Sequence, residues 1–287
     1  MVLVGVWEMS GVRFSVKSME ATRPAPIRLS PESYLAHLHQ ESRRFRHALA
    51  ACSPTDPVPS CPAWTAADLA YHLTEVQHFW RHVITTRPNP PDGYIEPPRA
   101  EDYVDQLSEF KRTSKAFLKA LRAAEAGQVA WSWASEQSVG FTYRRQALEA
   151  LVHRIDAEQT AGLESIIDPE LAADGVHEVL DIHYGGKPAW GAFSPLAHYV
   201  RIDLDDTRQS LWVQLGRFSG ERDGEHVDVG DFAVVSAPKA EPDAVISGSA
   251  SELLTRLWRR GDGHNLHVSG DQVIVDHFRQ LTHAPLN

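Results

Sequence analysis

The sequence predicts an N-terminal four-helix bundle followed by a smaller α+β domain, and two observations predict it. Apolar residues recur at spacings of three and four through four long segments before residue 165, which is the pattern of amphipathic helices. After about residue 168, short runs rich in Val, Ile, Phe and Trp replace that pattern, as in strands. Four helices of this length, with a long second connection, are typical of a bundle.

Length and charge limit the classes of function. The 287 residues are enough for one large domain or two ordinary ones. The net charge is −10 without any Lys/Arg block, which argues against nucleic acid or an anionic membrane as a partner. No apolar run approaches the roughly 20 residues of a membrane helix, and the start does not resemble a signal peptide. Two cysteines, Cys52 and Cys61, make no disulfide framework, so we expect a cytoplasmic protein, with a local bridge left open.

We expect three segments along the chain. Residues 1–29 look like a flexible tail, residues 30–165 form the bundle, and residues 168–287 form the α+β domain. The first helix opens at LSPESYLAHLHQ, where Ser30 caps it and a proline takes the first helical position. The second begins at Thr65, which is predicted to form a capping box with the carboxylate three residues later.

The remaining elements follow in order. The third helix comes after a connection dense in Pro and Gly, and its apolar stripe runs from Tyr103 to Leu121. The fourth is FTYRRQALEALVHRIDAEQTAG, with Gly162 as its stop. In the second domain we expect a short helix at HEVLDIHY, strands at HYVRIDLDD, SLWVQLGRF, DFAVVSA and DAVISG, a helix at SASELLTRLWRR, and a short strand and a helix within NLHVSGDQVIVDHFRQL.

Three side chains on two of these helices suit a single divalent ion. His72 points toward the bundle interior, because it shares the helical spacing of Leu69 and Val76. Glu149 and His153 are four residues apart, so they lie on one face of the fourth helix. One carboxylate and two neutral imidazoles suit Zn²⁺ and leave a fourth position open, as in catalytic sites.

Other interpretations of these residues remain open. About one Glu-x-x-x-His pair is expected by chance in a chain of this composition. The polar stripe of the fourth helix, which includes Gln146, Asp156 and Thr160, is also compatible with a solvated surface. A histidine such as His72 is more often a hydrogen-bonded core residue than a ligand. The residues alone leave a metal site and a structural histidine about equally favoured.

Three stretches carry a resemblance to a known family. VPSCPAWTAADLAYHL and YRRQALEALVHRIDAEQTAG resemble the second-helix and fourth-helix signatures of the mycothiol-dependent maleylpyruvate isomerase family, a branch of the DinB-like metal-binding bundles. DAVISGSASELLTRLWRRGDGHNLHVSGD resembles the sterol-carrier-like C-terminal domain of these proteins. The matches fall in order and span residues 30 to about 280.

The resemblance implies that His72, Glu149 and His153 bind zinc or another divalent metal, with mycothiol as the thiol co-substrate. The metal would lower the pKa of the thiol for attack on a small electrophilic substrate, either in S-transfer or in cis-trans isomerisation of a maleylpyruvate-like compound. Asp156, one turn beyond His153, is a candidate to orient that ligand, with an exposed helix carboxylate as the alternative. Arg260, or the arginine before it, is a candidate to bind a substrate carboxylate, against the alternative of a solvated helix end.

Two functions from other classes compete with this enzyme. One is a non-catalytic protein that binds a metal or a small ligand, and the other is a structural protein with a vestigial triad. We expect a monomer or a weak homodimer. The sequence identifies neither the electrophile nor the metal.

Overall fold

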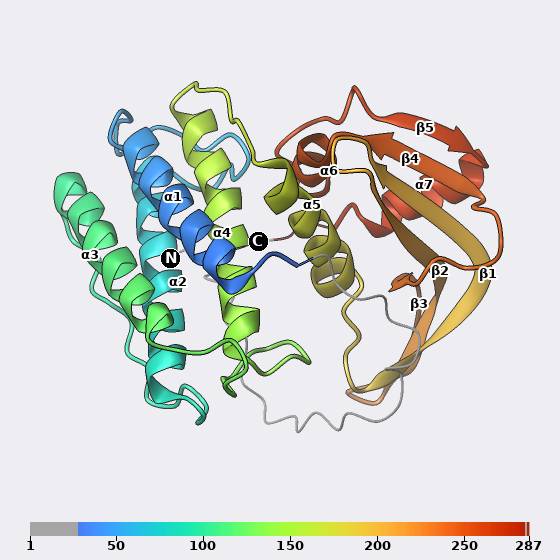
Figure 1. Cartoon of the computed structure of the whole chain (residues 1–287), viewed down its shortest axis with the longest axis horizontal. Helices are drawn as coiled ribbons and strands as arrows, with labels where there is room; N and C mark the ends of the chain where they lie inside the picture. Colours follow the sequence, from blue (N-terminus) through green and yellow to red (C-terminus); the bar gives the residue numbers. More distant parts are fainter. Residues whose placement is uncertain (1–27, 285, 287) are drawn as a thin grey trace. The chain divides into compact units, whose positions relative to one another are not determined.

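The computed structural model describes residues 28–284 and 286, so the tail predicted at residues 1–29 lies almost wholly outside the described residues. The described chain divides into two compact units, Arg28–Leu171 and Ala172–Asn287 (Figure 1). The first is a four-helix bundle and the second contains a five-stranded sheet, which confirms the predicted fold class. Both cysteines are free, so the local bridge does not form. Every helix within the described residues is too short or too polar to cross a membrane.

The ends of the bundle helices follow their local signals. The bundle consists of α1 (Pro31–Leu49), α2 (Ala66–Thr86), α3 (Tyr103–Arg122) and α4 (Val139–Thr160). Ser30 caps α1, and the capping box of α2 is complete, because Thr65 and Asp68 each accept the other's backbone N–H. Gly162 follows α4 with a φ of +67°, a conformation that glycine adopts without strain. These predicted boundaries are confirmed.

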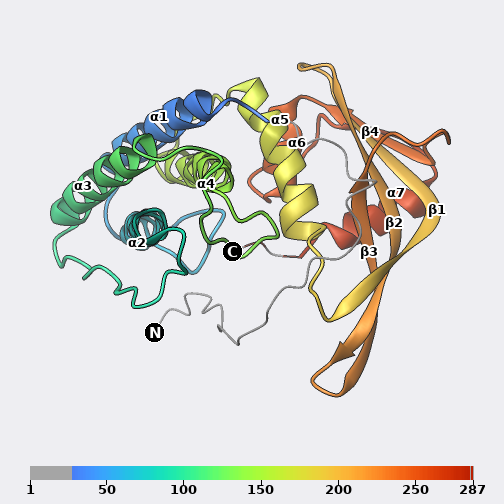
Figure 2. The ribbon, with the colours of Figure 1, turned by 60° about the horizontal axis from the view of Figure 1, so that its bottom comes forward.

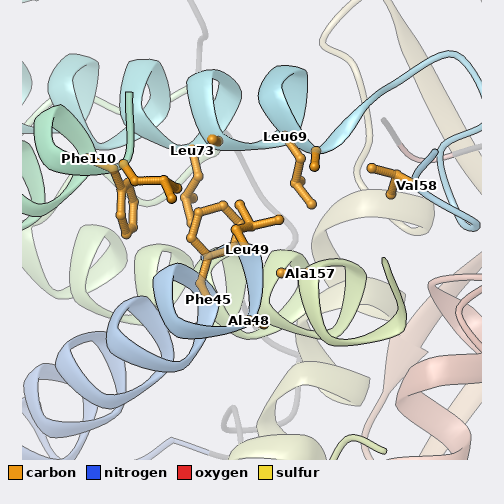
Figure 3. Packing of buried hydrophobic residues seen from close by; sticks show 11 residues of the cluster. Phe45, Ala48, Leu49, Val58, Leu69, Leu73, Phe110 and Ala157 are labelled. Atoms are coloured by element: carbon orange, nitrogen blue, oxygen red, sulfur yellow. The ribbon is translucent and has the colours of Figure 1, made fainter. Parts of the chain in front are cut away.

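The four helices surround a shared apolar cluster. Figure 2 shows the arrangement of the helices, with α2 seen nearly end-on. Within the bundle, α1 packs mainly against α4, and α2 packs mainly against α3. Figure 3 shows Phe45 of α1 and Phe110 of α3 packed with Leu49 and Leu73, and the two ring centroids are 4.9 Å apart. Burying each such side chain stabilises the fold by about 1.5–3 kcal/mol. This packing fixes α2, the helix that carries His72.

Almost every side chain of α4 is buried, although many of them are polar. Arg154 is fully buried, and its Nε donates to Glu41 of α1 at 2.6 Å while Nη1 donates to Glu158 at 2.7 Å. Glu158 also accepts hydrogen bonds from Arg44 at 3.0 Å and from the Ser165 hydroxyl at 2.7 Å. These ion pairs join α4 to α1 and compensate charges that burial would otherwise leave unfavourable.

The second unit is built on one mixed sheet. After α5 (Pro169–Glu178) and the π-helical turn η1 (Val179–Tyr184), its elements are β1 (Gly191–Leu204), β2 (Gln209–Arg222), β3 (Glu225–Val235), β4 (Ala244–Gly248), α6 (Ala250–Leu257), β5 (His267–Gly270) and α7 (Gln272–Leu281). The strand order is β3-β2-β1-β4-β5, with β1 and β4 parallel and the other neighbours antiparallel. Alternate residues of the strands are buried on the face that α7 covers, where the rings of Phe232 and Phe278 lie 5.7 Å apart.

The first three strands of the second unit are longer than the sequence predicts. β1 begins at Gly191, and β2 and β3 continue into a hairpin whose turn lies between Arg222 and Glu225. Glycine is unfavourable in strands on propensity alone, so these extensions gave no strand signal. Cross-strand packing overrides the propensity, because the ring of Phe218 occupies the space where a side chain at Gly191 would lie. The helix predicted at HEVLDIHY is present as the end of α5 and the π-helical turn that continues it.

Replacing Arg154 with Met should destabilise the bundle by about 3–5 kcal/mol, because Glu41 would keep a buried charge without its cation. The double variant Arg154→Met/Glu41→Leu also removes the Glu41 charge, while Glu158 keeps its bonds from Arg44 and Ser165, so most of that loss should be recovered. Urea denaturation followed by circular dichroism measures both. As a control, Arg44→Met should cost less than about 1 kcal/mol, because that side chain is 31% exposed. A double variant as unstable as Arg154→Met would contradict the explanation.

Candidate metal centre

The position of His72 follows from the way α2 begins. The loop before α2 is held in place by backbone hydrogen bonds, including one from the Val58 N–H to the Trp64 carbonyl at 3.0 Å. Thr65 then starts the helix through its capping box. His72 lies two turns further on, and its ring centroid is 4.6 Å from that of Trp64. The loop and the first two turns of α2 therefore form one rigid support for this histidine.

The structure brings together all three ligands that the resemblance implies. The Oε1 atom of Glu149 lies 3.2 Å from Nε2 of His153 and 3.7 Å from Nε2 of His72. One nitrogen or oxygen atom of each residue lies within 4.8 Å of the other two. The side chains of His72, Glu149 and His153 are 24%, 19% and 9% exposed, so the centre is open to a ligand from outside.

Asp156 contacts the ring nitrogen of His153 that faces away from the centre. Its Oδ2 atom lies 2.9 Å from Nδ1 of His153, and its other oxygen accepts a hydrogen bond from the Ser60 hydroxyl. A carboxylate on the far ring nitrogen is the usual partner of a metal-binding histidine, and it leaves Nε2 facing the centre. Asp156 is fully buried, so the alternative of an exposed helix carboxylate is wrong. The solvated-surface interpretation is likewise wrong for Gln146, which is also buried.

Burial and neighbouring charges shift the pKa of each of the three residues differently. Burial lowers the pKa of His72. For Glu149, burial alone would raise the pKa, but hydrogen bonds from His153 and His72 and the positive charges nearby hold it well below its usual range. For His153, burial alone would lower the pKa, but hydrogen bonds to Asp156 and Glu149 and their charges raise it to about 9. Without a metal, His153 is therefore the protonated histidine at neutral pH.

Sequence reasoning missed three residues that shape this centre. Arg145 donates from Nη2 to Oε2 of Glu149 at 2.8 Å, and its spacing of four residues on the same helix was a usable signal. Ser60 lies 96 positions from Asp156, so no local pattern connects the two residues. Trp64 directly precedes the cap of α2, and its ring lies beside both His72 and His153, with centroid distances of 4.6 and 6.1 Å.

Arg260 lies in the second unit, shortly after α6. Its Nη1 atom donates to the carbonyl of Trp258 at 2.7 Å, and its guanidinium lies 5.9 Å from the centre of that residue's indole ring. The side chain is half-buried. These contacts hold the guanidinium close to the end of α6, and its role toward a substrate stays a prediction.

The chain matches the sequence profiles of two known domains. Residues 35–158 match the mycothiol maleylpyruvate isomerase N-terminal domain, and residues 170–276 match the C-terminal domain of the same type, MDMPI. No curated protein sequence gives a significant match.

Two crystal structures are similar to the whole fold, one of a mycothiol-dependent maleylpyruvate isomerase and one of a mutant of it. Each superposes with a TM-score of 0.58 at 11% sequence identity, covering 86% of this chain and 96% of the other. Similarity at this identity establishes the fold, whereas the two domain matches, in the right order, account for most of the chain. The chain belongs to the mycothiol-dependent maleylpyruvate isomerase family.

Proposed function

We propose that this protein is a metal-dependent enzyme, with zinc as the favoured ion, that uses mycothiol as its thiol co-substrate. The observation that carries the proposal is the convergence of ligand atoms from α2 and α4 within 4.8 Å of one another. Two imidazole nitrogens and one carboxylate oxygen suit zinc and leave a position for a further ligand, although nickel and iron accept similar donors. When bound, the metal supplies a Lewis acid that lowers the pKa of a thiol.

The residues around the ligands hold them for that role. Asp156, itself bonded to Ser60, keeps Nε2 of His153 directed at the centre. Arg145 engages one oxygen of Glu149 and leaves the other for the metal. The indole of Trp64 lies beside both histidine rings and restricts water on that side. The centre is therefore preorganised on three sides.

The reaction we favour is thiol-assisted cis-trans isomerisation of a maleylpyruvate-like compound, because the family description names that activity. Thiol S-transfer to a small electrophile is the second candidate, and it differs only in that the thiol stays bound to the product. Arg260 is proposed to bind a carboxylate of the substrate. We further propose small-molecule partners only, a monomer or weak homodimer, and a cytoplasmic location, which the two free cysteines support.

Untagged protein should contain about one zinc per chain by elemental mass spectrometry, since three protein ligands are present. His72→Ala, Glu149→Ala and His153→Ala should each lose most of it. His78→Ala is the matched control, because that residue lies on the same helix but bonds to Tyr94 instead of facing the centre. Full metal content in any of the three ligand variants would remove that residue from the site.

Zinc affinity should rise with pH up to about 9 and then level off. Only neutral imidazole binds the metal, and the pKa of His153 is raised to about 9 in the metal-free protein, so binding below that pH must displace its proton. The gain should be about tenfold per pH unit. Calorimetry at pH 7 in buffers of different ionisation enthalpy should detect about one proton released per zinc. A pH-independent affinity between 7 and 9 would rule out a protonated His153.

Asp156→Asn should weaken zinc binding by about 10- to 100-fold while the three ligands stay in place, because the amide no longer holds His153 with a charge. Ser60→Ala should have a smaller effect in the same direction, since it removes only the hydroxyl that holds Asp156. Competition with a chromophoric zinc chelator measures both affinities. Unchanged affinity in Asp156→Asn would show that this carboxylate acts on stability alone.

A further inference from the structure

Two buried polar side chains of α4 have no partner. Gln146 is 1% exposed and Thr142 is fully buried, and neither the Gln146 Oε1 nor the Thr142 Oγ1 has a hydrogen-bond partner within the described part of the chain. Two other buried glutamines also have an unpartnered Oε1, but their Nε2 atoms are anchored: Gln77 donates to Ser42 at 3.0 Å, and Gln106 donates to a backbone carbonyl at 2.8 Å. The Gln146 amide has no such anchor among the described contacts. Folded proteins seldom keep a buried amide in this state.

Thr142 and Gln146 lie on the same face of α4 as Glu149 and His153. Thr142, Gln146, Glu149 and His153 follow one another at spacings of four, three and four, so they lie on one face of α4. Gln146 comes one helical turn before Glu149, about 4.5 Å along the helix axis. The unpartnered amide is therefore the next polar group on the helix face that carries two of the metal ligands.

The neighbouring helix does not supply the missing partners. α2 runs antiparallel to α4, because His72 faces the C-terminal half of α4 while Trp80, later on α2, lies 6.1 Å from Phe141 at the start of α4. One turn after His72 on its own face of α2 come Glu75 and Val76, and Phe79 follows one turn later. Val76 and Phe79 are apolar, and the half-buried Glu75 makes no hydrogen bond to either atom, so α2 leaves the Gln146 Oε1 and the Thr142 Oγ1 without a partner.

We propose that Gln146 and Thr142 form a subsite for the amide of an N-acylated cysteine thiol whose sulfur reaches the metal centre. The inference rests on the function proposed above. The amide nitrogen of such a thiol is three bonds from its sulfur, within about 4 Å, which matches one turn of helix between Glu149 and Gln146. A glutamine presents an acceptor and a donor, as an amide ligand requires. A carboxylate does not suit the subsite, because Arg145, the adjacent cation, is bonded to Glu149.

The test compares two thiols on the cobalt-substituted full-length protein, in which thiolate binding gives a near-ultraviolet charge-transfer band. N-acetylcysteamine carries the amide, and 2-methoxyethanethiol has similar reach without it. The unaltered protein should prefer the first by about fivefold, the size of one or two net hydrogen bonds. Gln146→Met should bring the ratio close to one, and Thr142→Val should reduce it less. Gln77→Met, a buried glutamine with its own partner, should leave the ratio unchanged.

Thermal denaturation of the metal-free proteins gives a second measurement. Gln146→Met should keep or raise the melting temperature, because it removes a buried group without a partner, whereas Gln77→Met should lower it. Three results would overturn the subsite and leave the proposed function standing. They are a thiol preference that Gln146→Met retains, equal binding of the two thiols to the unaltered protein, and a lowered melting temperature of Gln146→Met. No band with either thiol in the unaltered protein would instead overturn the proposed function, and the subsite with it.

Discussion

The burial of α4 is the constraint on which the rest of the bundle depends. A helix with almost every side chain buried, and with four charged residues between Arg145 and Asp156, is stable only if its neighbours supply opposite charges. α1 does so through Glu41, which pairs with Arg154. Toward α2 the charges alternate along one face, from Arg145 through Glu149 and His153 to Asp156. The groups that compensate buried charge on this face are also those that would hold a metal, so stability and the site are built from the same residues.

Much of the bundle could be predicted because its signals are local. Ser30 and the Thr65–Asp68 pair mark helix starts through side chains within four residues of the backbone groups they satisfy, and Gly162 marks a stop through its own conformation. The hairpin extension of β2 and β3 could not be predicted in the same way. At Gly220 the backbone of Trp190 and Gly191 leaves no room for a side chain, so strand pairing favours a residue that propensity disfavours, and that pairing is not local.

In the candidate site, too, local spacing predicted some residues, whereas tertiary packing determined the others. Helical spacing alone placed Glu149 and His153 on one face, but the same spacing occurs by chance, and only the resemblance favoured them as ligands together with His72. Whether Asp156 was exposed depended on how the loop before α2 folds over it, which periodicity does not describe. The contribution of Ser60 follows from tertiary packing, so no pattern in its own segment pointed to it.

The capping box at Thr65 has a consequence for how this chain tolerates changes in length. Each residue of a helix turns its side chain by about 100°, so the direction of His72 is counted from the point where α2 starts. A residue inserted before the cap changes only the loop, whereas one inserted between Thr65 and His72 rotates the histidine away from Glu149. The interval of seven residues from Thr65 to His72 therefore sets the direction in which the histidine side chain points. Relatives that keep the centre are therefore constrained to preserve that count, whereas loop positions other than Ser60 and Trp64 are freer to vary.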